Sequence, residues 1–170
     1  MRKNFTFVYL LLLAVQLMLT NYFHVTSYIT LTILPVMVFC IPVKTSPSAA
    51  MIIAFATGLV VDFFADGVPG LNAAALIPVA LLRNPLIRLI FGDEAFERNE
   101  NFAPAKFGMA KISVAILMIQ SIFLLIYIIL DGAGTRPFVF NIIRFGTSLI
   151  TGYLLSLFAI GILSPDDRRS

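Results

Sequence analysis

The chain contains few charged residues and only one cysteine. Charged residues make up 12% of its 170 residues, whereas hydrophobic residues make up 59%. A soluble domain of this size has no core large enough to hide so much apolar side chain. The composition therefore predicts an integral membrane protein. Because Cys40 is the only cysteine, an intramolecular disulfide is excluded. Its position in an apolar run predicts a small, core-filling role.

Residue patterns that carry catalysis are also missing. His24 is the only histidine, and no Cys, Asp or Glu lies near it to complete a metal site. The chain has no Gly-rich phosphate loop and no HExxH or GxSxG motif. The net charge of +3 comes from basic residues scattered among loops, which argues against nucleic-acid binding. We therefore predict no catalytic residue, no cofactor site and no metal site.

Six segments are long and apolar enough to cross a bilayer, which requires about 20 residues per helix. Short Gly- and Pro-containing turns separate them, so the sequence predicts an all-α bundle that forms one transmembrane domain over residues 1–170. The first segment exceeds a signal-peptide core and lacks a cleavage site, so we expect it to be retained. The predicted spans are Phe5–Phe23, Val25–Val43, Pro47–Ala65, Gly70–Ile90, Phe107–Leu130 and Phe138–Leu163.

The basic residues predict the orientation of these spans. Six spans place both termini on one side of the membrane. Ten basic residues fall on that side, and only Arg136 and Arg144 fall on the other. Cytoplasmic segments carry the excess of Lys and Arg, so both termini are predicted to be cytoplasmic. The ten residues are Arg2, Lys3, Lys44, Arg83, Arg88, Arg98, Lys106, Lys111, Arg168 and Arg169.

Two of the spans carry small residues at four-residue spacing, each row ending in one charge. Such spacing lets a neighbouring helix approach closely, and a charge at membrane depth usually faces a partner inside the protein. Since both charges fall near the outer end, we predict an Asp62–Arg144 ion pair. The alternatives are that each charge reaches water or headgroups, or has another partner. The rows are Ala50, Ala54, Gly58 and Asp62, and Arg144, Ser148, Gly152 and Ser156.

Antiparallel packing of the two rows would bring specific small residues together. It would align Gly58 with Ser148 and Ala54 with Gly152. The sequence thus predicts direct packing between the third and sixth spans.

The stretch 55–74, FATGLVVDFFADGVPGLNAA, carries a resemblance to a known family. A helix ending in Gly-Leu-x-x-Asp (Gly58 to Asp62), a short turn, and Gly70-Leu before an alanine-rich helix resemble the central signature of MreD. This is the family of rod shape-determining membrane proteins. The length, the hydropathy and the short basic amino terminus agree with the family along the whole chain.

The resemblance implies a fold and a function. MreD proteins are similar in architecture to the six-helix substrate-binding components of energy-coupling-factor transporters. They are non-enzymatic and act in the bacterial inner membrane with the single-pass protein MreC. Together with MreC they belong to the bacterial elongation machinery, which couples MreB filaments to peptidoglycan synthases and so controls cell shape. By this likeness, the chain is a scaffold of the elongation machinery, and self-association remains open.

Two other functions are compatible with a small helical membrane protein. A vitamin-type uptake component would share the fold, but such proteins resemble one another in an Ala-x-x-x-Ala element on the first helix. Here Met18 follows Ala14 at that spacing. A proton-coupled transporter using Asp62 would often show repeated halves, which the sequence lacks.

Overall fold

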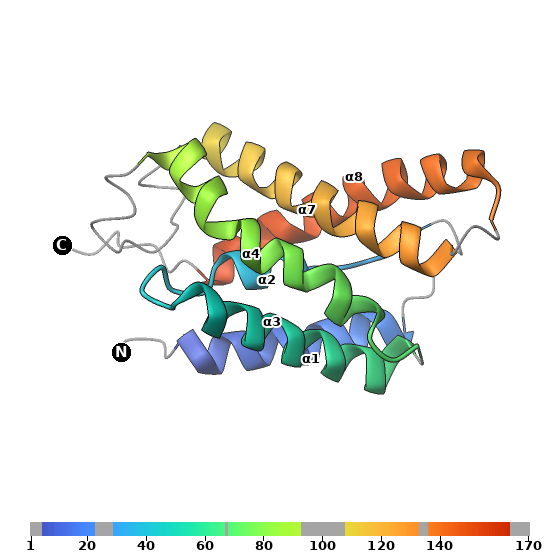
Figure 1. Cartoon of the computed structure of the whole chain (residues 1–170), viewed down its shortest axis with the longest axis horizontal. Helices are drawn as coiled ribbons and strands as arrows, with labels where there is room; N and C mark the ends of the chain where they lie inside the picture. The colour runs from blue at the N-terminus through green and yellow to red at the C-terminus, as the bar shows by residue number, and fades with distance from the viewer. Residues whose placement is uncertain (1–4, 23–28, 67, 93–107, 133–135, 164–170) are drawn as a thin grey trace.

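The computed structural model describes residues 5–22, 29–66, 68–92, 108–132 and 136–163 (Figure 1). Within these ranges the regular structure is entirely helical. A π-helical turn, η1, continues α3 directly. The elements are α1 (Phe5–Tyr22), α2 (Leu34–Phe39), α3 (Pro47–Val61), η1 (Asp62–Asp66), α4 (Leu71–Phe91), α7 (Met109–Gly132) and α8 (Phe138–Leu163).

Five of these helices are long and apolar enough to cross a membrane: α1, α3 with the start of η1, α4, α7 and α8. At about 1.5 Å per residue, spans of 18 to 25 residues are about 27–38 Å long, which is enough to cross a hydrocarbon core of roughly 30 Å. The chain is therefore a multi-pass membrane protein. The expected bounds of these five spans are confirmed to within about two residues. At the start of α3, Ser46 is followed by Pro47, a sequence typical of a helix N-terminus, and the Ser46 side chain accepts a hydrogen bond from Ala49 N at 3.3 Å.

The predicted helix over Val25–Val43 is wrong in its described part. Residues 29–33 are not helical, and α2 contains six residues, all of them buried. Pro35 lies in the first turn of α2, where its missing N–H costs nothing, so it begins a helix instead of bending one. Pro42 follows the helix end. At about 1.5 Å per residue, α2 is too short to cross the bilayer alone. Residues 23–28 lie outside the described ranges.

The helices pack as successive neighbours around α2. α3 packs against α4, α4 against α7, and α7 against α8, while α2 touches α1, α3, α4, α7 and α8. Figure 1 shows α1 beginning and α8 ending at the same end of the bundle, on the left of the view. The non-helical residues 29–33, called here the crossing segment, run as a narrow trace from the opposite end to α2. This segment and the two ends of the bundle hold the polar side chains described next.

Candidate functional site

Asp62 lies at the junction of α3 and η1 and caps the start of α4. Its side chain is 1% exposed. Oδ2 accepts hydrogen bonds from Gly70 N at 3.0 Å and Ala73 N at 3.1 Å. Oδ1 accepts from Asn72 N at 2.8 Å and Asn72 Nδ2 at 2.9 Å. The first amides of a helix have no partner within it, and the helix dipole favours an anion there. The carboxylate therefore has a buried partner, and that partner is the N-terminus of α4.

Two glycines of the α3–α4 hairpin make this capping geometry possible. Gly70 immediately precedes α4 with φ +92°, a left-handed conformation that glycine adopts without a steric penalty. One helical turn before Asp62, Gly58 lies against the backbone of α4. A Cβ on Gly58 would overlap N and Cα of Ala73 and lie 2.8 Å from the carbonyl carbon of Asn72. The small residues of α3 thus allow close approach, and their neighbour is α4.

Arg144 lies on α8 and bonds to the end of α7. Its Nη1 pairs with Asp131 Oδ2, and its Nε donates to Thr30 Oγ1 at 3.3 Å. Its guanidinium carbon lies 5.6 Å from the centre of the Tyr127 ring, within cation–π range. Arg136 Nη2 lies 3.6 Å from the same Asp131 oxygen.

The predicted Asp62–Arg144 pair is therefore wrong. Both side chains are buried, but each has its own partners within the described residues. The reason is topological: α7 and α8 form an antiparallel helical hairpin, which brings Asp131, at the end of one helix, beside the start of the next. The rule that hairpin-linked helices are neighbours was the sequence signal for this partner.

The predicted alignment of the two rows of small residues is also wrong. The row on α8 faces the crossing segment and α7. Ser148 Oγ accepts from Thr30 N at 2.8 Å. A Cβ on Gly152 would overlap Nε2 of Gln120 on α7 and lie 2.9 Å from that side chain's amide carbon. Equal spacing on two helices indicated that each is approached closely, but it did not identify which helix approaches.

The crossing segment is held by two buried glutamines and Ser148. Gln16 Oε1 accepts from Ile33 N at 2.8 Å, and its Nε2 donates to Leu31 O at 3.2 Å. Gln120 Nε2 donates to Thr32 O at 3.4 Å. Non-helical backbone is tolerated at membrane depth only where protein groups or water satisfy it. Helices α1, α7 and α8 therefore each supply a side chain that replaces a missing helical hydrogen bond.

Arg83 serves the other end of α2. This side chain on α4 is fully buried, and its Nε donates to Phe39 O at 3.0 Å. Its Nη2 donates to Ile41 O. The last carbonyls of a helix have no partner within it and carry the negative end of its dipole, so a cation is stabilised there. From the sequence, Arg83 counted only as one of the cytoplasmic basic residues, because a six-residue α2 was not foreseen.

The chemistry available to these groups is that of anchoring backbone. Asp62, Gln16, Gln120 and Arg83 each bond to main-chain atoms of another element. Within the described ranges, no three His, Cys, Asp or Glu residues are grouped so that they could hold a metal ion. The arrangement fixes the α3–α4 hairpin, the crossing segment and the α7–α8 hairpin relative to one another.

No protein-family model, curated protein or solved structure matches this chain.

Proposed function

We propose that this protein is a non-enzymatic scaffold of the bacterial cell-elongation machinery in the cytoplasmic membrane. In this proposal it acts with an MreC-like single-pass protein and, directly or through it, with peptidoglycan synthases. The observation that carries the proposal is the role of the signature residues. Gly58, Asp62 and Gly70, on which the resemblance to MreD depends, are the residues that build the α3–α4 hairpin. Sequence similarity at residues that have a defined structural role supports the resemblance more strongly than sequence similarity without such a role.

The proposal includes six membrane crossings with both termini in the cytoplasm. The crossing segment and α2 together would form the second crossing, which returns the chain from the end of α1 to the start of α3. The placement of the described basic residues supports this orientation. Lys44 precedes α3, Arg88 lies in the last turn of α4 and Lys111 in the first turn of α7, and these helix ends lie at the end of the bundle where α1 begins (Figure 1). Arg136 precedes α8, which begins at the other end. The more basic end is the one expected inside.

Cysteine labelling tests this orientation. The native Cys40 is first replaced by alanine. Val68→Cys, in the exposed turn before α4, should then react with a membrane-impermeant maleimide applied to intact cells. Ser48→Cys, exposed at the start of α3, should react only after the membrane is permeabilised. Labelling of Ser48→Cys from outside, with Val68→Cys protected, would overturn the proposed orientation.

The partner is proposed to contact the outer ends of the helices. Apolar side chains there are strongly exposed, including Tyr22, Phe63 and Phe138. Lipid tails are as apolar as these side chains, so association would depend on close packing. Large aromatic surfaces are suited to that kind of contact.

Site-specific crosslinking in cells, followed by mass spectrometry, tests the function. Photo-crosslinking residues at Phe63 and Phe138 should trap an MreC-like protein, whereas the same residue at Leu89, exposed near the inner end of α4, should not. Affinity isolation in mild detergent should recover that protein as well. Recovery of an ATPase-linked coupling subunit would instead support the alternative, a small-molecule uptake component. Uniform crosslinks, or none to an MreC-like protein, would count against the scaffold.

A further inference from the structure

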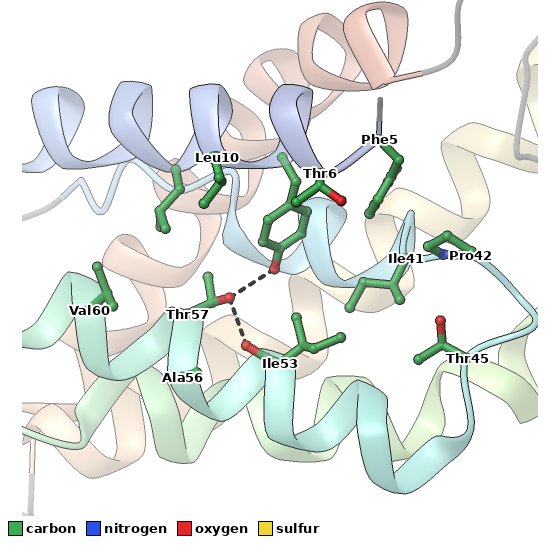
Figure 2. Close-up of a pocket in the computed structure, with 12 residues that line it drawn as sticks. Phe5, Thr6, Leu10, Ile41, Pro42, Thr45, Ile53, Ala56, Thr57 and Val60 are labelled. Carbon is green, nitrogen blue, oxygen red and sulfur yellow. Dashed lines mark hydrogen bonds between the residues drawn. The ribbon is translucent and has the colours of Figure 1, made fainter. Parts of the chain in front are cut away.

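An apolar groove lies between α1, α3 and the loop after α2 (Figure 2). It has a volume of about 510 Å³, and Leu10, Leu13, Ile41, Ile53 and Val60 are among its lining residues. Both helices belong to the membrane-spanning set, so the groove opens toward hydrocarbon. The proposed function makes no use of it.

The polar groups in the floor of the groove satisfy one another. Tyr9 Oη and Thr57 Oγ1 lie 2.9 Å apart, and Thr57 Oγ1 also donates to Ile53 O at 2.7 Å (Figure 2). These hydrogen bonds leave the groove with apolar atoms for an occupant to contact. Ala56 on α3 has the smallest side chain among the lining residues. At this position the protein leaves space in the groove that a larger side chain would fill. Its chemistry suits a hydrocarbon chain.

The length of the groove distinguishes an acyl chain from a protein helix. On α1 it extends from Phe5 to Leu13, which is about 12 Å at 1.5 Å per residue. A partner transmembrane helix would require a groove matching the roughly 30 Å hydrocarbon core. One leaflet is about half that thickness. The groove therefore matches the tail of a single lipid in one leaflet.

The polar end of the groove indicates the headgroup. Thr6 and Thr45 lie at the end where α1 and α3 begin, and Leu10 and Val60 lie toward the other end (Figure 2). Lys44, which is exposed, precedes Thr45 directly. Two hydroxyl groups line this end of the groove, and an exposed lysine adjoins one of them in the sequence. Together they can complement an anionic lipid headgroup whose tail lies in the groove.

We propose that this groove binds an anionic phospholipid, with one acyl chain between α1 and α3 and the headgroup at Thr6, Thr45 and Lys44. Bound in this way, the lipid fills the space between the first and third helices in the leaflet on the Lys44 side. The inference depends on the membrane location of the chain and is independent of the proposed scaffold function.

Photolabelling of the full-length protein in vesicles tests the tail position. Phosphatidylcholine vesicles are doped with phosphatidylglycerol that carries a diazirine on its acyl chain. Labelled peptides should concentrate at residues 5–13 and 53–60. Ala56→Phe, which fills the groove from an exposed position, should lower this labelling about fivefold or more. Ala74→Phe, the same change at an exposed position on α4, should leave it unchanged. Equal labelling in both variants, or labelling spread evenly over all helices, would overturn the proposal.

Three further measurements test saturation, headgroup preference and the identity of the occupant. In the unchanged protein, unlabelled phosphatidylglycerol should suppress groove labelling until the suppression saturates. Suppression merely in proportion to dilution of the probe would overturn the proposed site.

A phosphatidylglycerol probe should label the groove about fivefold more than a phosphatidylcholine probe, as one lysine at an anionic headgroup predicts. Lys44→Gln should remove this preference, and Lys111→Gln should not. Equal labelling by both probes would overturn the headgroup assignment, and native mass spectrometry that finds a peptide in place of phospholipid would overturn the occupant.

Discussion

Replacement of Gly58 by alanine is expected to destabilise the protein by about 3 kcal/mol, near the upper end of the usual cost of overpacking. The new methyl group would overlap N and Cα of Ala73 and lie 2.8 Å from the carbonyl carbon of Asn72. These are backbone atoms inside α4, so they cannot rotate away as a side-chain tip can. Relief requires α3 and α4 to separate, and separation also weakens the Asp62 cap one turn further on. Thermal melting in mild detergent and the amount of protein in the membrane measure the effect.

Gly146→Ala on α8 is the matched control. A Cβ at that position meets no atom of the described residues within 4 Å. Alanine is favoured over glycine in a helix by about 1 kcal/mol, so this variant should be neutral or slightly stabilised. Gly152→Ala should fall between the two, because the Gln120 amide that it displaces is flexible but would lose its bond to Thr32 O. Equal melting temperatures for Gly58→Ala and Gly146→Ala would refute close α3–α4 packing as the role of Gly58.

The five long helices were predictable because a run of about 20 apolar residues is enough to identify a membrane-spanning helix. The prediction of a helix over 25–43 was wrong in its described part, although this apolar run meets the length criterion. The backbone of residues 29–33 is not helical and forms its hydrogen bonds with side chains of other helices. Gln16, Gln120 and Ser148 satisfy the crossing segment from three other helices. Such support is formed only by tertiary structure, so a pattern read within 25–43 could not show it.

The candidate site was predictable as a set of buried charges and small residues, but not as a set of contacts. Asp62 and Arg144 are both buried within the bundle, as their position in apolar runs indicated. Their opposite signs and similar depth suggested a pair. The competing partners were closer along the chain: Gly70, which immediately precedes α4, lies eight residues after Asp62, and Asp131 lies 13 residues before Arg144. Short connections favour neighbouring elements, and here that rule outweighed the match of charge and depth.

Asp62→Asn is expected to lower the free energy of unfolding by about 2–4 kcal/mol, because each buried donor left unpaired costs roughly 1–3 kcal/mol. The carboxylate accepts two hydrogen bonds on each oxygen. An amide can keep one oxygen toward Asn72, but its NH2 group then faces the N–H groups of Gly70 and Ala73. Thr151→Ala is the control, since within the described ranges that hydroxyl bonds only to carbonyls of its own helix. It should change stability by no more than about 0.5 kcal/mol.

Double-mutant cycles distinguish this capping role from an ion pair with Arg144. Because Asp62 and Arg144 share no partner among the described residues, the effects of Asp62→Asn and Arg144→Gln should add within about 0.5 kcal/mol. Arg144→Gln and Asp131→Asn should be non-additive, with a coupling of about 1 kcal/mol, since the Asp131 side chain is 19% exposed and partly screened by water. Reversible unfolding in detergent measures all of these variants. Coupling between Asp62 and Arg144, with additivity between Arg144 and Asp131, would reverse the assignment of partners.

Loss of cell shape in Asp62→Asn at unchanged stability would show that the carboxylate acts in function directly. A cap that only orders α4 cannot be lost without a cost in unfolding free energy.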